Sequence, residues 1–430
     1  MIQKRNIFAF FIAFILVVLL FFNEITAFLT NIKYIQYFDE LFMIVLIFYV
    51  LITLSLTRKV SKDHLSVFLV FSAMVAMTLV NRNASYMKIL IQSFIHLKFF
   101  IFFYIFREIK KRFPGLLERV FFSLFVLSVT GIIVSFVLQE SFISFFGISP
   151  LYRYGLLRIH GFQLNINNLA KTCSIFFIYF VFFRERPLQR HLFFISIAAF
   201  SIFVTLIFGS RAILVAPLLS IFFFEKEKFR DKKIFIFVSF FIIIVLLLIL
   251  QMLKTTELYE ITLKNIEDIS DAEQSSYIRG IMIYYGFVLF FKHFPFGTGA
   301  ASFGSVLSEG SPVYTRLGLD KLLFFKEMEG VYDSNLATVM GEFGLTGLLM
   351  FAFLIYTVLK RLKSKEYNYD KTPSYYNLLI MLFIVFSISG PTFMHSYTSL
   401  LFALALNLRL GYTAENASCG KKTLTESECV

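Results

Sequence analysis

The sequence predicts an all-α polytopic membrane protein, and two observations carry this prediction. Of the 430 residues, 58% are hydrophobic and only 16% are charged, whereas soluble domains have about 25% charged residues. The apolar residues also form long runs separated by short basic loops. A water-soluble fold of this length cannot bury so much apolar surface, so a cytosolic enzyme, a secreted disulfide scaffold and a disordered chain are excluded.

The apolar runs predict about twelve membrane-spanning helices, because each crossing needs roughly 20 residues. The expected spans cover residues 7–22, 41–56, 65–80, 89–106, 120–138, 169–183, 192–208, 212–224, 234–250, 336–359, 376–390 and 397–410. The run at 212–224 is the weakest and could be tilted or re-entrant. One transmembrane domain over residues 1–410 is therefore expected, followed by a polar cytoplasmic tail over 411–430.

The basic residues predict the orientation of these spans. Positive charges gather at 58–62, 107–119, 184–190, 226–233 and 360–371, and the loops between these clusters carry far fewer. Loops rich in lysine and arginine stay in the cytoplasm, so both termini are expected on that side. The net charge of +13 is then a consequence of topology, and nucleic acid is not an expected partner.

The largest outer segment runs from 251 to 335. Inside it, the apolar stretch at 278–291 is too short to span a bilayer. We expect it to form a helix that lies on the membrane surface or packs on the bundle. The glycines and proline at 294–304 then predict a turn region.

Five segments that could carry chemistry all fall on the outer side, at 158–168, 209–211, 277–280, 294–299 and 333–347. Three of them carry an arginine: Arg158, Arg211 and Arg279. The planar guanidinium group holds phosphate or pyrophosphate through two hydrogen bonds. Arginines gathered at one membrane face suit a lipid-linked pyrophosphate, although each alone could instead reach out to lipid phosphate.

Other residues on this side could have either a functional or a purely structural role. Gly297 and Gly299 allow close approach of a ligand, or they simply form a turn. Asp333 could act as a general base or bind a hydroxyl, and it could also cap the helix expected near residue 336. Asn167 and Asn168 could cap the sixth span. The three glycines at 341, 344 and 347 share one helix face and favour close helix packing.

Two ionisable residues, His96 and Lys98, lie in the middle of the fourth expected span. Charges inside a membrane are costly and indicate a cavity or an ion pair. Glu342, early in the tenth span, is a candidate partner for Lys98. The pair could line a functional cavity or serve only the structure.

The order of these motifs resembles the O-antigen polymerase and ligase superfamily of bacterial envelope assembly, and most of all its Wzy-type polymerases of polysaccharide repeat units. The matching residues are Arg158/Gly161/Phe162/Asn168, Ser210/Arg211, Arg279, Pro295/Gly297/Gly299 and Glu342/Gly344/Gly347. Ligases of the superfamily typically have a histidine where this chain has Asp333, at the same spacing from the Gly344–Gly347 motif. The aspartate therefore favours a polymerase.

The resemblance implies a metal-independent glycosyltransferase without a cofactor. Such an enzyme polymerises undecaprenyl-pyrophosphate-linked glycans at the outer face of the bacterial inner membrane, making O-antigen, capsule or exopolysaccharide. Its catalytic residues would be Asp333, Arg211 and Arg279, and its substrate-binding residues would be Arg158, Asn168, Ser210, Gly297 and Gly299. The scheme also allows a chain-length regulator and a flippase as partners. Two alternatives stay open: an O-antigen ligase that transfers glycan to lipid A core, and a membrane transporter or flippase.

Overall fold

The structure, a computed structural model, describes residues 2–32, 62–80, 83–153, 156–182, 188–208, 213, 215–224, 278–328, 330–332, 334–363 and 373–408, with isolated positions between 34 and 52. The long helices are α1 (Ile2–Phe21), α4 (Lys62–Val80), α5 (Tyr86–Arg112), α6 (Leu116–Leu138), α8 (Ile166–Phe182), α9 (Leu188–Phe208), α10 (Val215–Phe224), α13 (Ile278–Lys292), α16 (Asn335–Leu362), α17 (Pro373–Ser389) and α18 (Ser396–Asn407).

The shorter elements connect these helices. They are α2 (Asn23–Thr30), α7 (Glu140–Phe145), η2 (Gly161–Gln163), η4 (Val306–Ser308), α14 (Pro312–Arg316), η5 (Leu319–Lys321) and α15 (Leu323–Lys326). Two strands of two residues each, β1 (Tyr152–Arg153) and β2 (Leu156–Leu157), pair antiparallel. The described residues are therefore overwhelmingly helical, as the sequence predicts.

Ten of the expected spans fall on described helices: α1, α4, α5, α6, α8, α9, α10, α16, α17 and α18. Three of these, α5, α6 and α16, are long and apolar enough to cross a membrane. The bent pair Phe10–Phe21 and Asn23–Thr30 adds a fourth if it counts as one span. The expected span at 41–56 lies largely outside the described residues, and the one at 234–250 lies wholly outside them.

The bend of 90° after α1 is not predicted by the hydropathy pattern. At this point the side-chain oxygen of Asn23 accepts a hydrogen bond from the backbone N–H of Glu24 at 2.9 Å. Asparagine side chains compete with the helix for backbone groups in this way. The polar pair Asn23–Glu24 therefore interrupts an apolar run that would otherwise continue straight.

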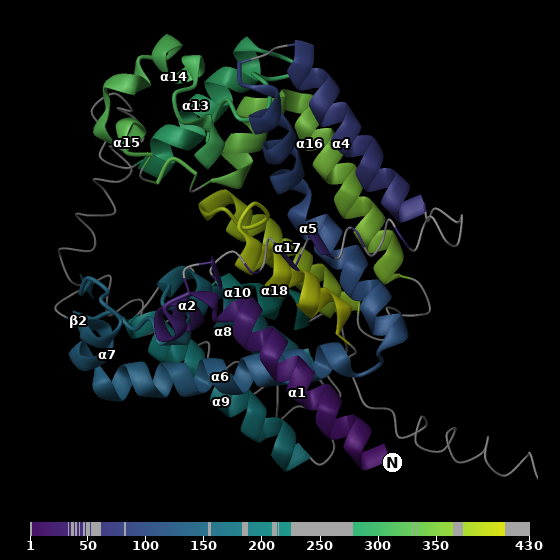
Figure 1. Cartoon of the computed structure of the whole chain (residues 1–430), viewed down its shortest axis with the longest axis vertical. Coiled ribbons are helices and arrows are strands. Elements are labelled where there is room, and N and C mark those ends of the chain that lie inside the picture. Colours follow the sequence, from purple (N-terminus) through teal and green to yellow (C-terminus); the bar gives the residue numbers. More distant parts are fainter. Residues whose placement is uncertain are drawn as a thin grey trace, which may run out of the picture.

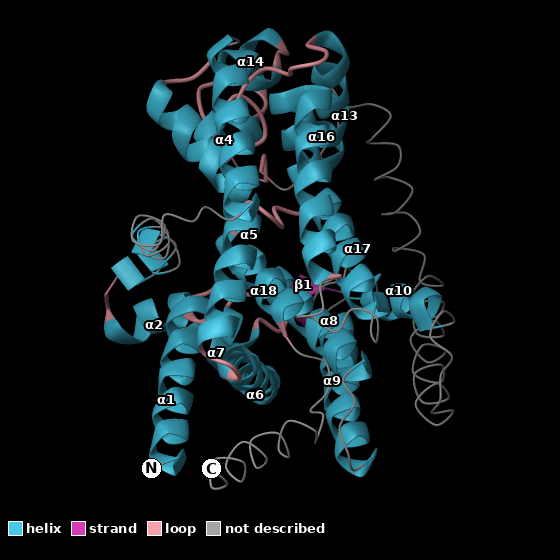
Figure 2. Cartoon of the chain, turned by 90° about the vertical axis from the view of Figure 1, so that its right-hand side faces the viewer, coloured by secondary structure: helices cyan, strands magenta, loops and turns pink. Residues whose placement is uncertain are grey.

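The helices divide into an upper and a lower group, and the same division is visible in two views a quarter turn apart (Figures 1 and 2). The upper group contains α4, α13, α14, α15 and α16, and the lower group contains α1, α2, α6, α7, α8 and α9. The α17–α18 pair lies between the groups, and α5 runs from one to the other and packs along α18. The upper group has a core of its own, around Met282, Phe303 and Tyr314.

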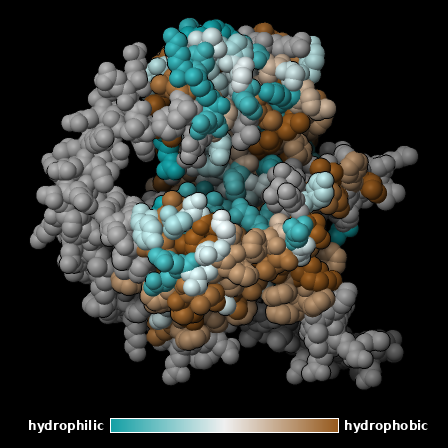
Figure 3. All heavy atoms as spheres, turned by 60° about the vertical axis from the view of Figure 1, so that its left-hand side comes forward, coloured by the Kyte–Doolittle hydropathy of each residue, from teal (hydrophilic) through white to brown (hydrophobic). Residues whose placement is uncertain are grey.

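Several helices expose large apolar side chains. On α4 the side chain of Phe68 is 63% exposed, and on α6 the side chains of Phe122 and Val126 are also exposed. Apolar faces of this extent suit contact with lipid. Figure 3 shows hydrophilic atoms in a hollow between the upper and lower parts of the molecule. Apolar surface and a polar recess are thus separated on the same protein.

The helix expected at 278–291 is confirmed as α13, and it packs on the bundle. Its neighbour is α16, and Gly286 lies against that helix. A Cβ atom at Gly286 would lie 3.1 Å from the Cα atom of Ala337. The absence of a side chain at Gly286 therefore brings the two helices into backbone contact.

The helix α16 is broken at Gly344, whose backbone angles are φ 59° and ψ −145°. The turn after α13 replaces the missing helical hydrogen bonds. Thr298 N–H donates to the carbonyl of Gly341 at 2.9 Å, and Gly299 N–H donates to the carbonyl of Glu342 at 2.7 Å. Beyond the break, Thr346 N–H donates to the carbonyl of Pro295 at 3.2 Å. We call this mutual pairing of 295–299 with 341–346 the interlock.

We predict that Gly344→Ala destabilises the protein much more than Gly115→Ala. Both glycines have positive φ angles, which cost an alanine roughly 1–2 kcal/mol. A Cβ atom at Gly344 would also lie 2.6 Å from the carbonyl oxygen of Pro295, whereas nothing lies within 4 Å of one at Gly115. Overpacking adds about 1–3 kcal/mol. Thermal unfolding of both purified variants in detergent tests this, and equal stability losses would contradict it.

Candidate functional site

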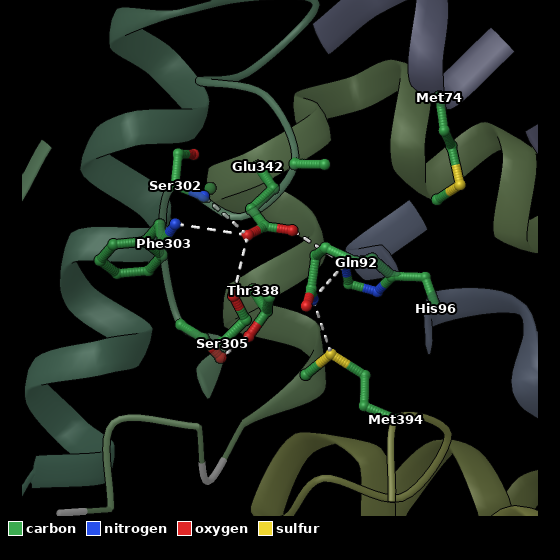
Figure 4. Close-up of polar contacts among 12 residues, drawn as sticks. Met74, Gln92, His96, Ser302, Phe303, Ser305, Thr338, Glu342 and Met394 are labelled. Carbon is green, nitrogen blue, oxygen red and sulfur yellow. Dashed lines mark hydrogen bonds and ion pairs between the residues drawn. The ribbon is translucent and has the colours of Figure 1, made fainter. Parts of the chain in front are cut away.

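The interlock surrounds a buried carboxylate, that of Glu342, whose side chain is fully buried. One oxygen, Oε2, lies 2.8 Å from Nε2 of His96 on α5. The other, Oε1, accepts hydrogen bonds from the backbone N–H of Ser302 at 3.0 Å and of Phe303 at 3.4 Å. The hydroxyl of Ser305 lies 3.4 Å from the same oxygen (Figure 4). One carboxylate thus ties α16 both to α5 and to the loop after α13.

The imidazole of His96 lies among aromatic rings and one amide. Its Nε2 atom is 3.1 Å from Nε2 of Gln92, one turn earlier on α5. Gln92 in turn contacts the sulfur of Met394 at 3.5 Å (Figure 4). The ring of Phe343 meets the imidazole edge-on at a centroid distance of 5.2 Å. A carboxylate and an imidazole in such an apolar setting form a buried ionisable pair.

The structure gives Glu342 a different partner from the one that the sequence suggested. Lys98 donates a hydrogen bond to the hydroxyl of Ser396 at 2.6 Å, and Glu342 pairs with His96. Residues two apart on a helix face roughly opposite sides. His96 therefore meets α16 while Lys98 turns toward α18, so the expected Lys98–Glu342 pair is wrong.

The polar segment at 158–168 lies at the start of α8, in the lower group. Gln163 donates to the hydroxyl of Ser128 on α6 at 2.7 Å. The buried His160 lies 3.3 Å from the carbonyl of Leu164. Burial lowers the pKa of His160, and the charge of Arg158 lowers it further. The hydrogen bond with the Leu164 carbonyl opposes this shift only in part, so the surroundings favour the neutral imidazole.

The caps of α8 and α16 also differ from expectation. The side-chain oxygen of Asn165 accepts hydrogen bonds from the backbone N–H groups of Asn167 and Asn168, at 3.0 Å and 3.1 Å. Asn165 therefore does the capping that was expected of the two residues after it. On α16 the capping side chain is Ser334, which accepts from Ala337 N–H at 3.3 Å.

The structure places five of the expected site residues. Gly297 and Gly299 belong to the interlock, and the space that a side chain at Gly297 would need is filled by the backbone of Glu342. Arg279 is half-buried in the first turn of α13. Arg158 follows β2, and Asn168 is buried on α8.

The hairpin β1–β2 and α13 lie in different parts of the molecule (Figure 1). Arg158 and Arg279 are therefore carried by separate helix groups. Arg211, Ser210 and Asp333 lie outside the described residues. The structure consequently joins the Gly297–Gly299 turn to Glu342, and the three-arginine site stays a prediction.

One buried cation, Lys171, escaped the sequence analysis. It lies on α8 with only 8% of its surface exposed. The sequence did indicate this residue, because Lys171 lies inside the apolar run at 169–183 that was expected to span the membrane. Charged residues inside expected spans often mark functional positions. The polar residues between α17 and α18 had no such signal, since Thr392 and Ser396 are ordinary loop residues by type.

Comparison of the sequence with protein-family models and with curated proteins finds no match.

We predict that Glu342→Ala destabilises the protein by several kcal/mol. The change leaves the N–H groups of Ser302 and Phe303 without their acceptor, at about 1–3 kcal/mol for each buried group. Glu342→Gln keeps one oxygen acceptor and should lose less stability. Glu309→Ala, at an exposed position, is the control and should change stability by about 0.5 kcal/mol or less. Equal thermal stability of Glu342→Ala and Glu309→Ala would contradict the tie between α16 and the loop.

Proposed function

We propose that this chain polymerises polyprenyl-pyrophosphate-linked oligosaccharide repeat units at the outer face of the bacterial inner membrane. In this proposal the chain crosses the membrane about twelve times, with both termini in the cytoplasm. The supporting observation is the interlock, in which two separately recognised motifs, the Pro295–Gly299 turn and the Glu342–Gly347 helix, form one unit. The helix α13, which carries Arg279 in its first turn, packs on the same unit.

The proposed reaction transfers the glycan from one lipid carrier to the next. A hydroxyl of the acceptor unit attacks the anomeric carbon of the donor glycan, and the bond from that carbon to the pyrophosphate oxygen breaks. The pyrophosphate leaves with the electron pair, and its charge is stabilised by Arg211 and Arg279, with Arg158 as a further contact. Asp333 accepts the proton of the attacking hydroxyl. Ser210, Asn168, Gly297 and Gly299 line the substrate.

The burial of Glu342 gives the interlock a role in this proposal. Its carboxylate holds the loop 302–305 against α16 and α5, while Arg279 acts on the substrate from α13. Catalytic groups held on rigid, fully hydrogen-bonded elements lose less of their effect to motion. Glu342 is thus a positioning residue in this scheme.

A proton-coupled carrier is the second candidate function, favoured by the buried His96–Glu342 pair. Carriers place paired ionisable residues within the membrane and move substrate as the pair gains or loses a proton. A carrier would move a lipid-linked glycan across reconstituted vesicles without making polymer. It would also lose transport when His96 is replaced by glutamine.

The proposed orientation is tested by reporter fusions at two described positions. Alkaline phosphatase, which is active only outside the cytoplasm, should be active when fused after Lys321 and inactive when fused after Lys363. Green fluorescent protein, which folds in the cytoplasm, should show the reverse pattern. The same side for both positions would disprove the placement of 251–335 outside.

The polymerase is tested by chain elongation in vitro. The substrate is the lipid-linked repeat unit that accumulates in a strain lacking this chain, and products are resolved by length on a gel. Arg279→Ala and Arg211→Ala should each lower the rate at least tenfold, because each removes a charge that faces the leaving group. Arg316→Ala removes an exposed outer arginine and should keep the rate.

Full activity of Arg279→Ala and Arg211→Ala at equal expression would refute the arginine site. Transfer to lipid A core with no elongation would identify a ligase instead.

A further inference from the structure

One side of α13 carries exposed aromatic side chains. Tyr284, Phe287 and Phe291 are spaced three and four residues apart, so they share one face of the helix. All three are exposed, and Phe291 is 72% exposed. The opposite side carries Gly286 and Leu289, which are buried, and it packs against α16. The helix therefore has one face packed on the protein and one exposed aromatic face.

The turn after α13 extends this face. Phe294 and Phe296 are also exposed, at 59% and 47%. The ring of Phe290 joins Phe294 to the helix, because its centroid lies 5.2 Å from that of Phe291 and 6.2 Å from that of Phe294. We call the exposed rings at 284, 287, 291, 294 and 296 the aromatic face. Contiguous exposed apolar patches mark contact with another protein or with a membrane.

The turn that ends the aromatic face lies level with the ends of two apolar helices. Asn83, between α4 and α5, donates a hydrogen bond from its side-chain nitrogen to the carbonyl of Thr298 at 2.7 Å. Helix α5 is long and apolar enough to cross a membrane, and α4 is a shorter apolar helix. A turn between two such helices lies at the bilayer surface, because polar backbone is not exposed to lipid. The turn at 294–298 therefore lies at the same surface.

The direction of α13 gives the aromatic face a gradient of depth. A Cβ atom at Gly286 would touch Ala337 in the first turn of α16, whereas Pro295 accepts from Thr346 N–H beyond the break. The two helices therefore run the same way, and the turn lies nearest the middle of α16. The exposed apolar side of α16 begins at Leu349, about one turn further along. The rings of the turn are thus closer to the lipid-facing part of α16 than the start of α13 is.

Basic side chains gather at the same end of the aromatic face. Lys292 is exposed and follows Phe291 directly, and His293 comes next. Burial lowers the pKa of His293, and the nearby charges of Lys292 and Arg316 lower it further. Arg316 belongs to α14, so two separate elements supply cations here. Aromatic rings next to lysine and arginine are typical of the headgroup level of a bilayer.

The chemistry of the aromatic face fits lipid better than a glycan. Four of its five side chains are phenylalanine, and Tyr284 alone offers a hydroxyl, whereas a site for a polar ligand needs several hydrogen-bonding groups. Helix α13 has 15 residues, and crossing a bilayer needs roughly 20. The helix can therefore enter the boundary between lipid headgroups and acyl chains, and it is too short to cross the membrane.

We propose that the aromatic face inserts into the phospholipid bilayer at the boundary between headgroups and acyl chains, deepest at Phe294 and Phe296. Lys292 and Arg316 lie at the level of the lipid phosphates and hold the face there. The interlock, which includes the turn at 295–299, is thereby kept at the membrane surface. This contact requires a membrane protein, and it does not depend on polymerase activity.

The test uses tryptophan fluorescence, because the chain contains no tryptophan of its own. Phe294→Trp, Phe291→Trp and Tyr284→Trp each place one indole on the aromatic face, and Asp320→Trp places one at an exposed charged position of η5. Each full-length variant is reconstituted into vesicles of phosphatidylglycerol and phosphatidylcholine, with or without bromine on the acyl chains. Bromine quenches an indole that contacts lipid, and acrylamide quenches one that contacts water.

We expect brominated lipid to quench Phe294→Trp most, Tyr284→Trp less, and both at least severalfold more strongly than Asp320→Trp. Acrylamide should quench in the reverse order. Bromine near the headgroup end of the acyl chain should quench more than bromine near the methyl end, because the basic side chains keep the face at headgroup level. Thermal unfolding should show that the variants fold like the wild type, since exchanges at exposed positions change stability little.

Four results would overturn the proposal. Quenching of Phe294→Trp by acrylamide but not by brominated lipid would place the face in water. Protection from both quenchers would mean that protein, such as a second copy of this chain, covers it. Stronger quenching by bromine at the methyl end would place the face in the bilayer core, and stronger lipid quenching of Tyr284→Trp than of Phe294→Trp would reverse the depth order. None of these results bears on the elongation assay, so the membrane contact and the polymerase stand or fall separately.

Discussion

A helix that breaks inside an apolar protein must have every freed backbone group paired again, and in α16 the turn at 295–299 does this. The N–H groups of Thr298 and Gly299 bind carbonyls before the break, and the carbonyl of Pro295 accepts from Thr346 beyond it. Water is scarce at such a place, so an unpaired group would cost several kcal/mol. The turn at 295–299 and α16 therefore form one structural unit.

Glu342 extends this constraint from the backbone to the side chains. Its position just before the break leaves its carboxylate facing the loop rather than the next helical turn, and two loop N–H groups bind it. The remaining oxygen reaches His96 on α5. A buried ionisable pair of this kind adds little net stability, because its desolvation offsets much of the attraction. It fixes which face of α5 meets α16.

The helices themselves were predictable from the sequence, and their partners were not. Apolar runs give the spans because bilayer thickness sets helix length, and the short stretch at 278–291 correctly indicated α13. The expected Lys98–Glu342 pair is wrong because hydropathy indicates how deep in the membrane a residue lies. It does not indicate toward which neighbouring helix the side chain points. Asn165, rather than Asn167 or Asn168, caps α8, and Ser334 caps α16. The glycines at 341 and 344 pointed to close packing, yet their neighbour is a loop rather than a helix.

The hydrogen bond between Asn335 and Phe393 N–H joins the first residue of α16 to the turn after α17. The interlock pairs the middle of the same helix with the turn at 295–299. Two turns that lie far apart in the sequence are therefore connected through one helix, and the link at its first residue is a single amide side chain.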